Sequence, residues 1–271
     1  HLWHIRFLIV ISLLALSVDS YCQVLPRYSS LLNRVNLETW VQDSARQFDA
    51  EGVLLSDGYY HPVNICRYGL MTLELYNETK DAEWLQKSKN QVAYFLDSNR
   101  TNVLFDGKGI GLPYNFEYKG LMPPWYSGMA QGLAASFLLR FAEIEKDSSL
   151  NELVPKLIYT MLQPQELGGC LSRTAENLLW IEEYPNATQS PQVLNGAVFA
   201  LFGLMDYCRV FPEDKRAKQV LSECIFGLKT ALPYYDSQNW PKYNRRTVYP
   251  NRFDYIHLQV FQMWQLYEYL N

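Results

Sequence analysis

Apolar residues recur at helical spacing through most of this chain. Runs with apolar side chains every three or four residues predict helices over 37–48, 64–76, 82–96, 127–144, 150–162, 192–208, 214–228 and 255–270. From residue 64 onward these helices form three consecutive pairs, and the last one reads as the first half of a fourth pair. The pattern therefore predicts a mainly α protein built from helical hairpins.

The first helix of each pair carries a glycine at an equivalent place. Gly69, Gly132 and Gly196 are 63 and 64 residues apart, and each precedes an apolar run. A repeat of this length with two helices per unit predicts stacked hairpins. We expect an α/α toroid, or barrel, in which the first helices line an inner wall. The glycines would let neighbouring helices approach closely, which outweighs their intrinsic cost of about 1 kcal/mol in a helix.

Long segments connect the predicted hairpins. They span 98–126, 163–191 and 233–254, and connections of this length are usually functional. The second segment, with Gly168 and Gly169 near its start and Glu182 to Pro185 near its end, predicts a short β-hairpin. No low-complexity linker divides the chain, so we predict one domain over 23–271 with the functional side chains on its rim.

The first residues have the pattern of a secretory signal. Arg6 precedes an apolar run over 7–18, and polar or small residues follow up to Cys22. This pattern predicts a signal peptide over 1–22 and an extracytoplasmic location, either secreted, periplasmic or in the lumen of the secretory pathway. A buried N-terminal helix and a short signal-anchor are the alternatives.

The cysteines do not have metal-ligand spacing. Cys22, Cys66, Cys170, Cys208 and Cys224 contain no CxxC pair, which argues against a zinc site. Cys208 and Cys224 fall on consecutive antiparallel helices, at heights about 12 Å apart at 1.5 Å per residue. A disulfide cannot span that separation, so we expect buried free thiols.

Composition and charge exclude several classes of protein. Of 271 residues, 48% are hydrophobic and 15% aromatic, with 20 tyrosines, which excludes a disordered chain. The net charge of −4 offers no excess of cations for phosphates, so we expect no nucleic-acid partner.

Arginines nevertheless cluster with tyrosines in the third connecting segment. Arg245, Arg246 and Arg252 lie between Tyr243 and Tyr255. A local group of arginines in an acidic protein suits an anionic group such as a carboxylate, which the guanidinium binds through two hydrogen bonds. The alternative is a set of surface arginines paired with nearby acids.

The first connecting segment contributes aromatic side chains. Tyr114, Trp125 and Tyr126 are candidates for a platform that stacks on a sugar ring, although for any single one of them core packing is the favoured role. His61 and His257 have no ligand partner at metal spacing, and we interpret both as structural. The sequence contains no phosphate-binding loop, dinucleotide fingerprint or GxSxG motif.

Several of these residues fall into motifs that occur in order along the chain. They are Tyr59-Tyr60-His61-Pro62, Arg67-Tyr68-Gly69-Leu70, Trp125-Tyr126-Ser127-Gly128-Met129-Ala130-Gln131-Gly132, Glu182-Glu183-Tyr184-Pro185, Val193-Leu194-Asn195-Gly196 and Arg252-Phe253-Asp254-Tyr255. Over about residues 55–270 the chain resembles the C-terminal catalytic domain of the heparosan/heparan sulfate D-glucuronyl C5-epimerases.

The resemblance implies an isomerase that interconverts D-glucuronate and L-iduronate within a polysaccharide. It implies catalytic roles for Tyr184, Tyr243, Tyr255 and Glu183, and it matches Arg246 to an arginine of the family's tyrosine-containing loop. Asn195 and Gln131, inside the matched motifs, join the arginines and aromatics as substrate-binding candidates. We expect no metal or other cofactor, an anionic glucuronate-containing polysaccharide as partner, and a homodimer as one assembly.

The reaction removes a proton next to a carboxylate, so it needs a cation at the carboxylate and an acid and a base on opposite faces of the sugar. Arginine charge near a tyrosine would favour the phenolate. Three alternatives stay open at the level of sequence. A polysaccharide lyase diverts the same carbanion into elimination, a glycan-binding module keeps the fold without catalysis, and a toroid hydrolase uses Glu182 or Glu183.

Overall fold

The computed structural model describes residue 28 and residues 37–186, 188–237, 241–247 and 253–270. The signal-like segment 1–22, Tyr249 and Arg252 lie outside these residues, and the side chain of Tyr255 is likewise not described. The helices of the described part are α3 Leu37–Val41, α4 Pro62–Thr79, α5 Ala82–Leu96, α6 Gly128–Glu145, α7 Leu150–Met161, α8 Leu194–Val210, α9 Lys215–Ala231 and α10 Phe253–Leu270. Short 3-10 helices, η2 Gln165–Leu167 and η3 Leu232–Tyr235, follow α7 and α9. The predicted mainly α architecture is confirmed.

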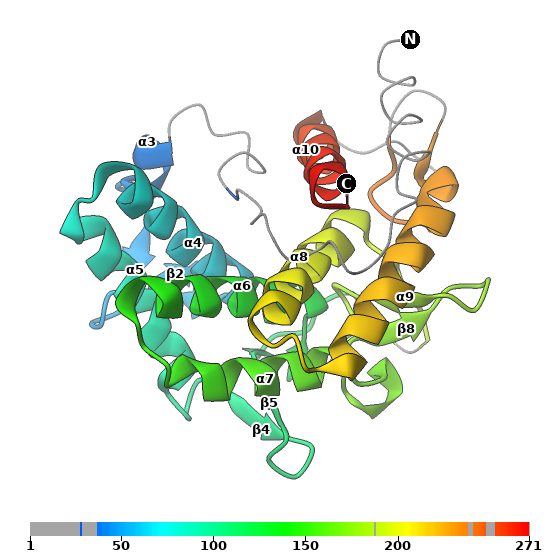
Figure 1. Cartoon of the computed structure of the whole chain (residues 1–271), viewed down its shortest axis with the longest axis horizontal. Helices are drawn as coiled ribbons and strands as arrows, with labels where there is room; N and C mark the ends of the chain where they lie inside the picture. Colours follow the sequence, from blue (N-terminus) through cyan, green and yellow to red (C-terminus); the bar gives the residue numbers. More distant parts are fainter. Residues whose placement is uncertain (1–27, 29–36, 187, 238–240, 248–252, 271) are drawn as a thin grey trace.

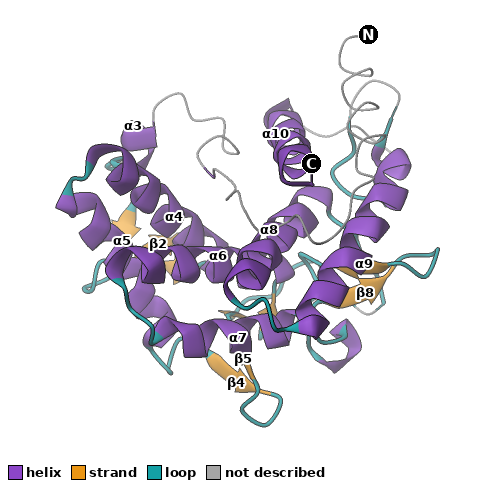
Figure 2. Ribbon diagram, in the orientation of Figure 1, coloured by secondary structure: helices purple, strands orange, loops and turns teal. Residues whose placement is uncertain are grey.

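The long helices stack as antiparallel hairpins, in the manner of an α/α toroid. Helices α4, α6, α8 and α10 pack side by side in one layer, and α5, α7 and α9 each pack against the helix that precedes them (Figure 1). Together they form an arc, with the α4–α5 pair at one end and α9 and α10 at the other (Figure 2). Helices α6 and α8 are buried on nearly every side, which explains why their sequences are apolar all round.

Tight connections hold each hairpin together. Helix α4 ends at Lys80 in the left-handed region (φ 60°), whose N–H bonds back to the Tyr76 carbonyl. Asp81 follows at once, and its side chain accepts a hydrogen bond from the Glu83 N–H at the start of α5. Ser127 and Asp214 cap α6 and α9 in the same way.

Two of the three repeated glycines bring helices together as predicted. A Cβ on Gly69 would lie 2.5 Å from the Phe137 ring of α6, and one on Gly132 would lie 2.6 Å from Cα of Ala200 in α8. Gly196 differs, because a Cβ there would meet the side chain of Glu183 rather than a neighbouring helix. The close approach of α8 to α6 depends instead on Gly203, which faces the backbone of Gly132.

Short antiparallel strands occupy the connections. They are β1 Gln47–Phe48, β2 Leu54–Ser56 and β3 Tyr59–Tyr60 in one sheet, and the pairs β4 Asn102–Leu104 with β5 Gly109–Gly111, β6 Pro113–Tyr114 with β7 Trp125–Tyr126, and β8 Leu171–Arg173 with β9 Leu179–Ile181. The last pair confirms the β-hairpin that was predicted in the second connecting segment.

The predicted helix over 37–48 is wrong in its second half. Helix α3 ends at Val41, and Gln47–Phe48 forms strand β1. The Asp43 side chain accepts a hydrogen bond from the Ala45 N–H, and this local bond turns the chain out of the helix. Pairing of Phe48 with Leu54 then completes the strand.

Cys66, Cys170, Cys208 and Cys224 are buried free thiols, as predicted. Burial raises the pKa of the Cys170 thiol well above its usual value, and the same holds for Cys66 and Cys224. These thiols therefore stay protonated and unreactive. Within the described residues, none of the helices is both long and apolar enough to cross a membrane.

Candidate active site

The candidate site lies at the end of the helical layer where α4, α6 and α8 begin. His61, Ser127 and Val193 are the residues at which these three helices start. A continuous series of ring contacts runs across this end, from His61 to Tyr114 (5.1 Å between centroids), from Tyr114 to Trp125 (4.1 Å) and from Trp125 to Tyr184 (5.9 Å). The connecting segments thus converge on one rim, as expected.

The predicted aromatic platform is a packed wall. Tyr114 and Trp125 face each other across the β6–β7 pair and are stacked with an interplanar angle of 9°. Both are buried, and the Trp125 Nε1–H donates to the Phe116 carbonyl at 2.9 Å. The Tyr126 hydroxyl accepts a hydrogen bond from Asn102 at 2.9 Å. The face of Tyr114 that was expected to stack on a sugar is covered by Trp125.

Tyr184, Glu183 and Tyr243 meet in one cluster, which we call the tyrosine centre. The Tyr184 hydroxyl lies beside the side chains of both Glu183 and Tyr243, close enough to interact with each of them. Burial, reinforced by the neighbouring Glu183 and Tyr243, raises the pKa of Tyr184 far above its usual value. Tyr184 is therefore a neutral phenol at pH 7. The structure brings together three of the four side chains that were predicted to be catalytic.

Backbone contacts fix the two chain segments that supply this centre. The Glu182 carbonyl, at the end of β9, accepts from the Gly128 N–H at 3.0 Å, and this bond anchors the next two residues against α6. The Leu194 N–H, in the first turn of α8, donates to the Tyr243 carbonyl at 3.1 Å. The second connecting segment is thus attached to the start of α6, and the third to the start of α8.

Glu183 is buried beside the first turn of α8. Its side chain fills the space that the missing side chain of Gly196 leaves. Burial raises the pKa of Glu183 to about 7, while the hydrogen bond from Tyr184 and the charge of Lys119 oppose the shift. This carboxyl therefore changes protonation state close to neutral pH, which suits a general base.

Lys119 is the residue at the tyrosine centre that sequence reasoning missed. Its ammonium lies 5.4 Å from the Tyr184 ring centroid and 5.9 Å from that of Tyr243. A lysine in the motif Tyr118-Lys119-Gly120-Leu121 reads as an ordinary surface turn. Its only local signal is the Lys-Gly pair, which indicates a turn and does not show where the ammonium points.

Glu182 holds the segment that leads into α8. Its buried carboxyl accepts hydrogen bonds from Ser172 Oγ at 2.8 Å, from Ser190 Oγ and from the Gln192 N–H at 3.0 Å. Burial raises the pKa of Glu182 to about 7, partly offset by these donors. The Tyr235 hydroxyl donates to the Gln192 carbonyl at 2.6 Å, so the same segment also holds the third connection.

The predicted arginines lie in different environments. Arg245 pairs with Glu176 through both guanidinium nitrogens, one of them at 2.7 Å, and stacks 4.0 Å over the Tyr234 ring. Arg246 is exposed, and its Nε donates to the Ser190 carbonyl at 3.1 Å. Both arginines therefore bind residues of the second connecting segment, Glu176 and Ser190.

Gln131 and Asn195 also differ from each other. All the amide hydrogen bonds of Gln131 go to backbone, from the Leu112 N–H and to the Ile110 and Leu157 carbonyls. Asn195 is buried beside Gly196, and within the described residues its Oδ1 has no hydrogen-bond partner. Asn195 therefore offers an acceptor near Glu183, whereas Gln131 is part of the scaffold.

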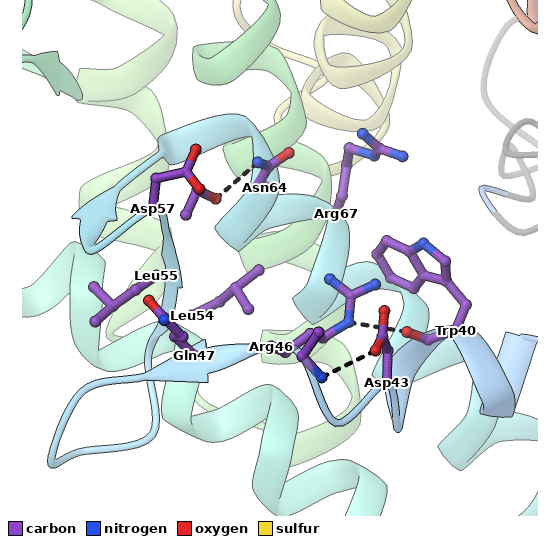
Figure 3. Close-up of a pocket in the computed structure, with 11 residues that line it drawn as sticks. Trp40, Asp43, Arg46, Gln47, Leu54, Leu55, Asp57, Asn64 and Arg67 are labelled. Carbon is purple, nitrogen blue, oxygen red and sulfur yellow. Dashed lines mark hydrogen bonds between the residues drawn. The ribbon is translucent and has the colours of Figure 1, made fainter.

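A separate pocket of about 360 Å³ lies at the start of α4 (Figure 3). Its lining comes from α3, β1, β2 and α4 and includes Trp40, Asp43, Arg46, Asn64 and Arg67. It shares no lining residue with the tyrosine centre. Among the residues that the structure describes, no three His, Cys, Asp or Glu side chains are grouped so as to hold a metal ion.

Comparison with known proteins identifies the family. The family model described as "D-glucuronyl C5-epimerase C-terminus" matches residues 106–271, a range that contains every residue of the tyrosine centre. The chain belongs to this family.

Two individual proteins are also similar to this chain in sequence. A D-glucuronyl C5-epimerase of Caenorhabditis elegans is 30% identical over 201 residues, which are 66% of this chain and 30% of that protein. An uncharacterized protein of Methanocaldococcus jannaschii is 26% identical over 211 residues, 74% of this chain and 68% of that protein. The chain thus spans less than a third of the length of the nematode epimerase.

Two solved structures also resemble the fold. They are an unsaturated glucuronyl hydrolase from Streptococcus agalactiae and a mutant of it. Each aligns over 77% of this chain and 58% of its own, at a TM-score of 0.46 and 11% to 12% identity.

Proposed function

We propose that this chain is a uronyl C5-epimerase that interconverts D-glucuronate and L-iduronate units of an anionic polysaccharide. The observation that carries the proposal is the tyrosine centre, in which the buried Glu183 and Tyr243 both lie beside the Tyr184 hydroxyl. Membership of the C5-epimerase family supports the choice of a uronate as substrate.

Proton transfer at C5 needs a base that is ionised near neutral pH. Tyr184 alone does not meet this need, because burial keeps its phenol protonated. Glu183, with a pKa of about 7, can accept the Tyr184 hydroxyl proton while the Tyr184 oxygen takes the proton from C5. The electron pair of the C–H bond then spreads into the carboxylate as an enediolate.

Epimerisation also needs a proton donor on the opposite face of the sugar. Tyr243 is one candidate, because it reaches the tyrosine centre from a different connecting segment than Tyr184. Tyr255 is the other. Position 255 shares a face of α10 with Gln259 and Gln262, which lie four and seven residues further on. Those glutamines donate to the carbonyls of Lys242 and Asn195, next to the tyrosine centre.

The mechanism requires no cofactor, because cationic side chains can neutralise the carboxylate. The extracytoplasmic location, the substrate polymer and a homodimeric assembly stay predictions. An extracytoplasmic location is consistent with the signal-like pattern over 1–22 and with a polysaccharide substrate.

Deuterium exchange tests the proposal. The protein is incubated in heavy water with heparosan or another glucuronate polymer, and deuterium at C5 is measured by mass spectrometry and NMR. We expect incorporation without shortening of the chains. Tyr184→Phe should reduce the rate by at least about 100-fold, the typical contribution of a general acid or base. Tyr59→Phe, which changes a tyrosine that is 72% exposed, is the matched control.

The alternatives give different results in the same experiment. Rising ultraviolet absorbance from an unsaturated uronate would identify a lyase, and shortened saturated chains would identify a hydrolase. Polymer binding that survives loss of Tyr243 and Tyr255, together with a wild-type protein that takes up no deuterium, would identify a glycan-binding module. Any of these results would contradict the epimerase.

A further inference from the structure

The turn that carries Lys119 holds it in an unusual backbone conformation. Tyr118 and Leu121 exchange two backbone hydrogen bonds, of 3.1 and 2.8 Å, across a two-residue connection. Both central residues have positive φ, 49° at Lys119 and 80° at Gly120, as in a type I′ turn. Glycine adopts this conformation freely, whereas lysine does so at a cost, and such costs concentrate at functional sites.

The turn projects the lysine ammonium over a group of tyrosines. Its Nζ lies 5.0 Å from the Tyr118 ring centroid, in addition to 5.4 and 5.9 Å from those of Tyr184 and Tyr243. These distances are within the range of cation–π attraction, so the rings hold the charge at the centre. The ammonium also acts electrostatically on the Glu183 carboxyl.

The charge of Lys119 is not used by a salt bridge within the described parts of the chain. By contrast, Arg245 is paired with Glu176, and Arg246 donates to the Ser190 carbonyl. Lys119 is exposed, so a ligand can reach its ammonium. A buried acid, two phenols and a reachable cation therefore occupy one place.

We infer that Lys119 binds the carboxylate of the uronate whose C5 proton is exchanged. The inference rests on the proposed function and names the cation which that reaction needs. The ammonium donates hydrogen bonds to the carboxylate, and its charge stabilises the enediolate as negative charge moves onto the carboxylate oxygens. Lys119 takes no part in the proton transfers, which belong to Glu183 and the tyrosines.

Binding measurements test this role independently of turnover. The probes are a heparosan octasaccharide and its carboxyl-reduced counterpart, in which each glucuronate is replaced by neutral glucose. By isothermal titration calorimetry, the wild-type protein should bind the acidic probe more tightly. In Lys119→Met, whose side chain is similar in length and uncharged, the ratio of the two affinities should fall by roughly 10- to 100-fold, as expected for loss of a hydrogen bond to a charged group. Lys119→Arg should retain part of it.

The chain provides a matched control. Lys80 also has a left-handed backbone (φ 60°), and its ammonium lies 5.3 Å from the Tyr76 ring centroid at the opposite end of α4. Lys80→Met should therefore leave the preference unchanged. Circular dichroism of all variants verifies that they fold.

Two results would overturn the inference. One is a Lys119→Met protein that keeps the wild-type preference for the acidic probe, and the other is a wild-type protein with no such preference. Failure of the epimerase proposal looks different, because the preference would persist while deuterium exchange at C5 is absent. In the active protein, Lys119→Met should also lower kcat for exchange, since the cation stabilises the transition state.

Discussion

Glu183 occupies the space next to α8 that exists because residue 196 is glycine. A Cβ at Gly196 would lie 2.5 Å from the Glu183 Cβ and 2.8 Å from its Cδ, distances that atoms in folded proteins do not adopt. The glycine that the repeat pattern assigned to helix contact therefore makes room for the acid of the site. Its substitution should affect chemistry more than folding.

Gly196→Ala should displace the Glu183 carboxyl from its place beside the Tyr184 hydroxyl. We expect the rate of deuterium exchange to fall by at least about 10-fold, because the general base no longer lies in position to accept the proton. The melting temperature should change little, because alanine gains about 1 kcal/mol of helix propensity that offsets the crowding. Gly203→Ala is the contrast, since its Cβ would meet the α6 backbone and should lower the melting temperature. Equal destabilisation by both variants would contradict this assignment.

The exchange rate should depend on the ionisation of Glu183. Burial raises its pKa to about 7, so the carboxylate that accepts a proton forms only as pH rises through that value. The rate should increase between about pH 6 and 8 and then level off. Glu183→Gln should be slow at every pH and should lack this rise. A pH–rate profile of kcat for both proteins provides the measurement, and an unchanged profile in the variant would exclude Glu183 as the base.

Glu182 should make the protein less stable as pH rises. Its pKa is raised from the ordinary 4.5 to about 7 by burial, so the folded state binds a proton that the unfolded state releases. The cost appears above about pH 4.5, grows until about pH 7 and then stays constant, reaching about 3 kcal/mol. Glu182→Gln keeps the shape and should reduce the slope of this part of the curve by about half, because burial raises the pKa of Glu183 to about 7 as well. Urea unfolding between pH 4.5 and 8 measures it, and parallel curves would contradict the prediction.

Gln131 should matter for stability. Replacing it by leucine would leave the Leu112 N–H and the Ile110 and Leu157 carbonyls without their partner, at a cost of about 3 kcal/mol in unfolding free energy. Gln86→Leu, which changes an exposed glutamine on α5, should stay within about 0.5 kcal/mol of wild type. Chemical denaturation compares the two. A Gln131→Leu protein of normal stability and weakened substrate binding would restore its predicted role in binding.

Arg245 should contribute less to catalysis than Lys119. Its guanidinium is bound to Glu176 and stacked on Tyr234, so Arg245→Ala removes a rim contact worth at most about 1 kcal/mol. We expect kcat for deuterium exchange within about threefold of wild type. The same assay on Lys119→Met provides the comparison. A loss in Arg245→Ala as large as in Lys119→Met would place Arg245 in contact with substrate.

The helical scaffold was predictable because its signal is periodic and strong. Apolar spacing located the long helices, and α4 starts two residues before its predicted first residue because Pro62 fits the first helical turn. The error at 37–48 arose where a local hydrogen bond, from Ala45 to Asp43, outweighed helical spacing. A side-chain-to-backbone bond of this kind is invisible to a hydrophobic pattern.

The site residues could be predicted only where they belong to a sequence motif. Glu183, Tyr184 and Tyr243 were selected by the Glu-Glu-Tyr-Pro motif and the tyrosine–arginine cluster, and they meet as expected. The roles of the other site residues depend on where their side chains point in the folded chain, which the sequence does not show. The Gln131 amide bonds to backbone groups, and Tyr114 is buried. Lys119 lies at the tyrosine centre because of a turn whose geometry the sequence does not specify.

The bond from the Leu194 N–H to the Tyr243 carbonyl joins the first turn of α8, which follows the Glu183 segment, to the third connecting segment. It involves main-chain atoms only, so among single substitutions only proline at position 194, which has no N–H, removes it. Grafting the Glu183 segment alone onto another helical toroid would therefore leave its tyrosine partner behind. The smallest transplantable unit of this chemistry is the pair of segments together with the first turn of α8, and divergence within the family is expected to preserve that unit as a whole.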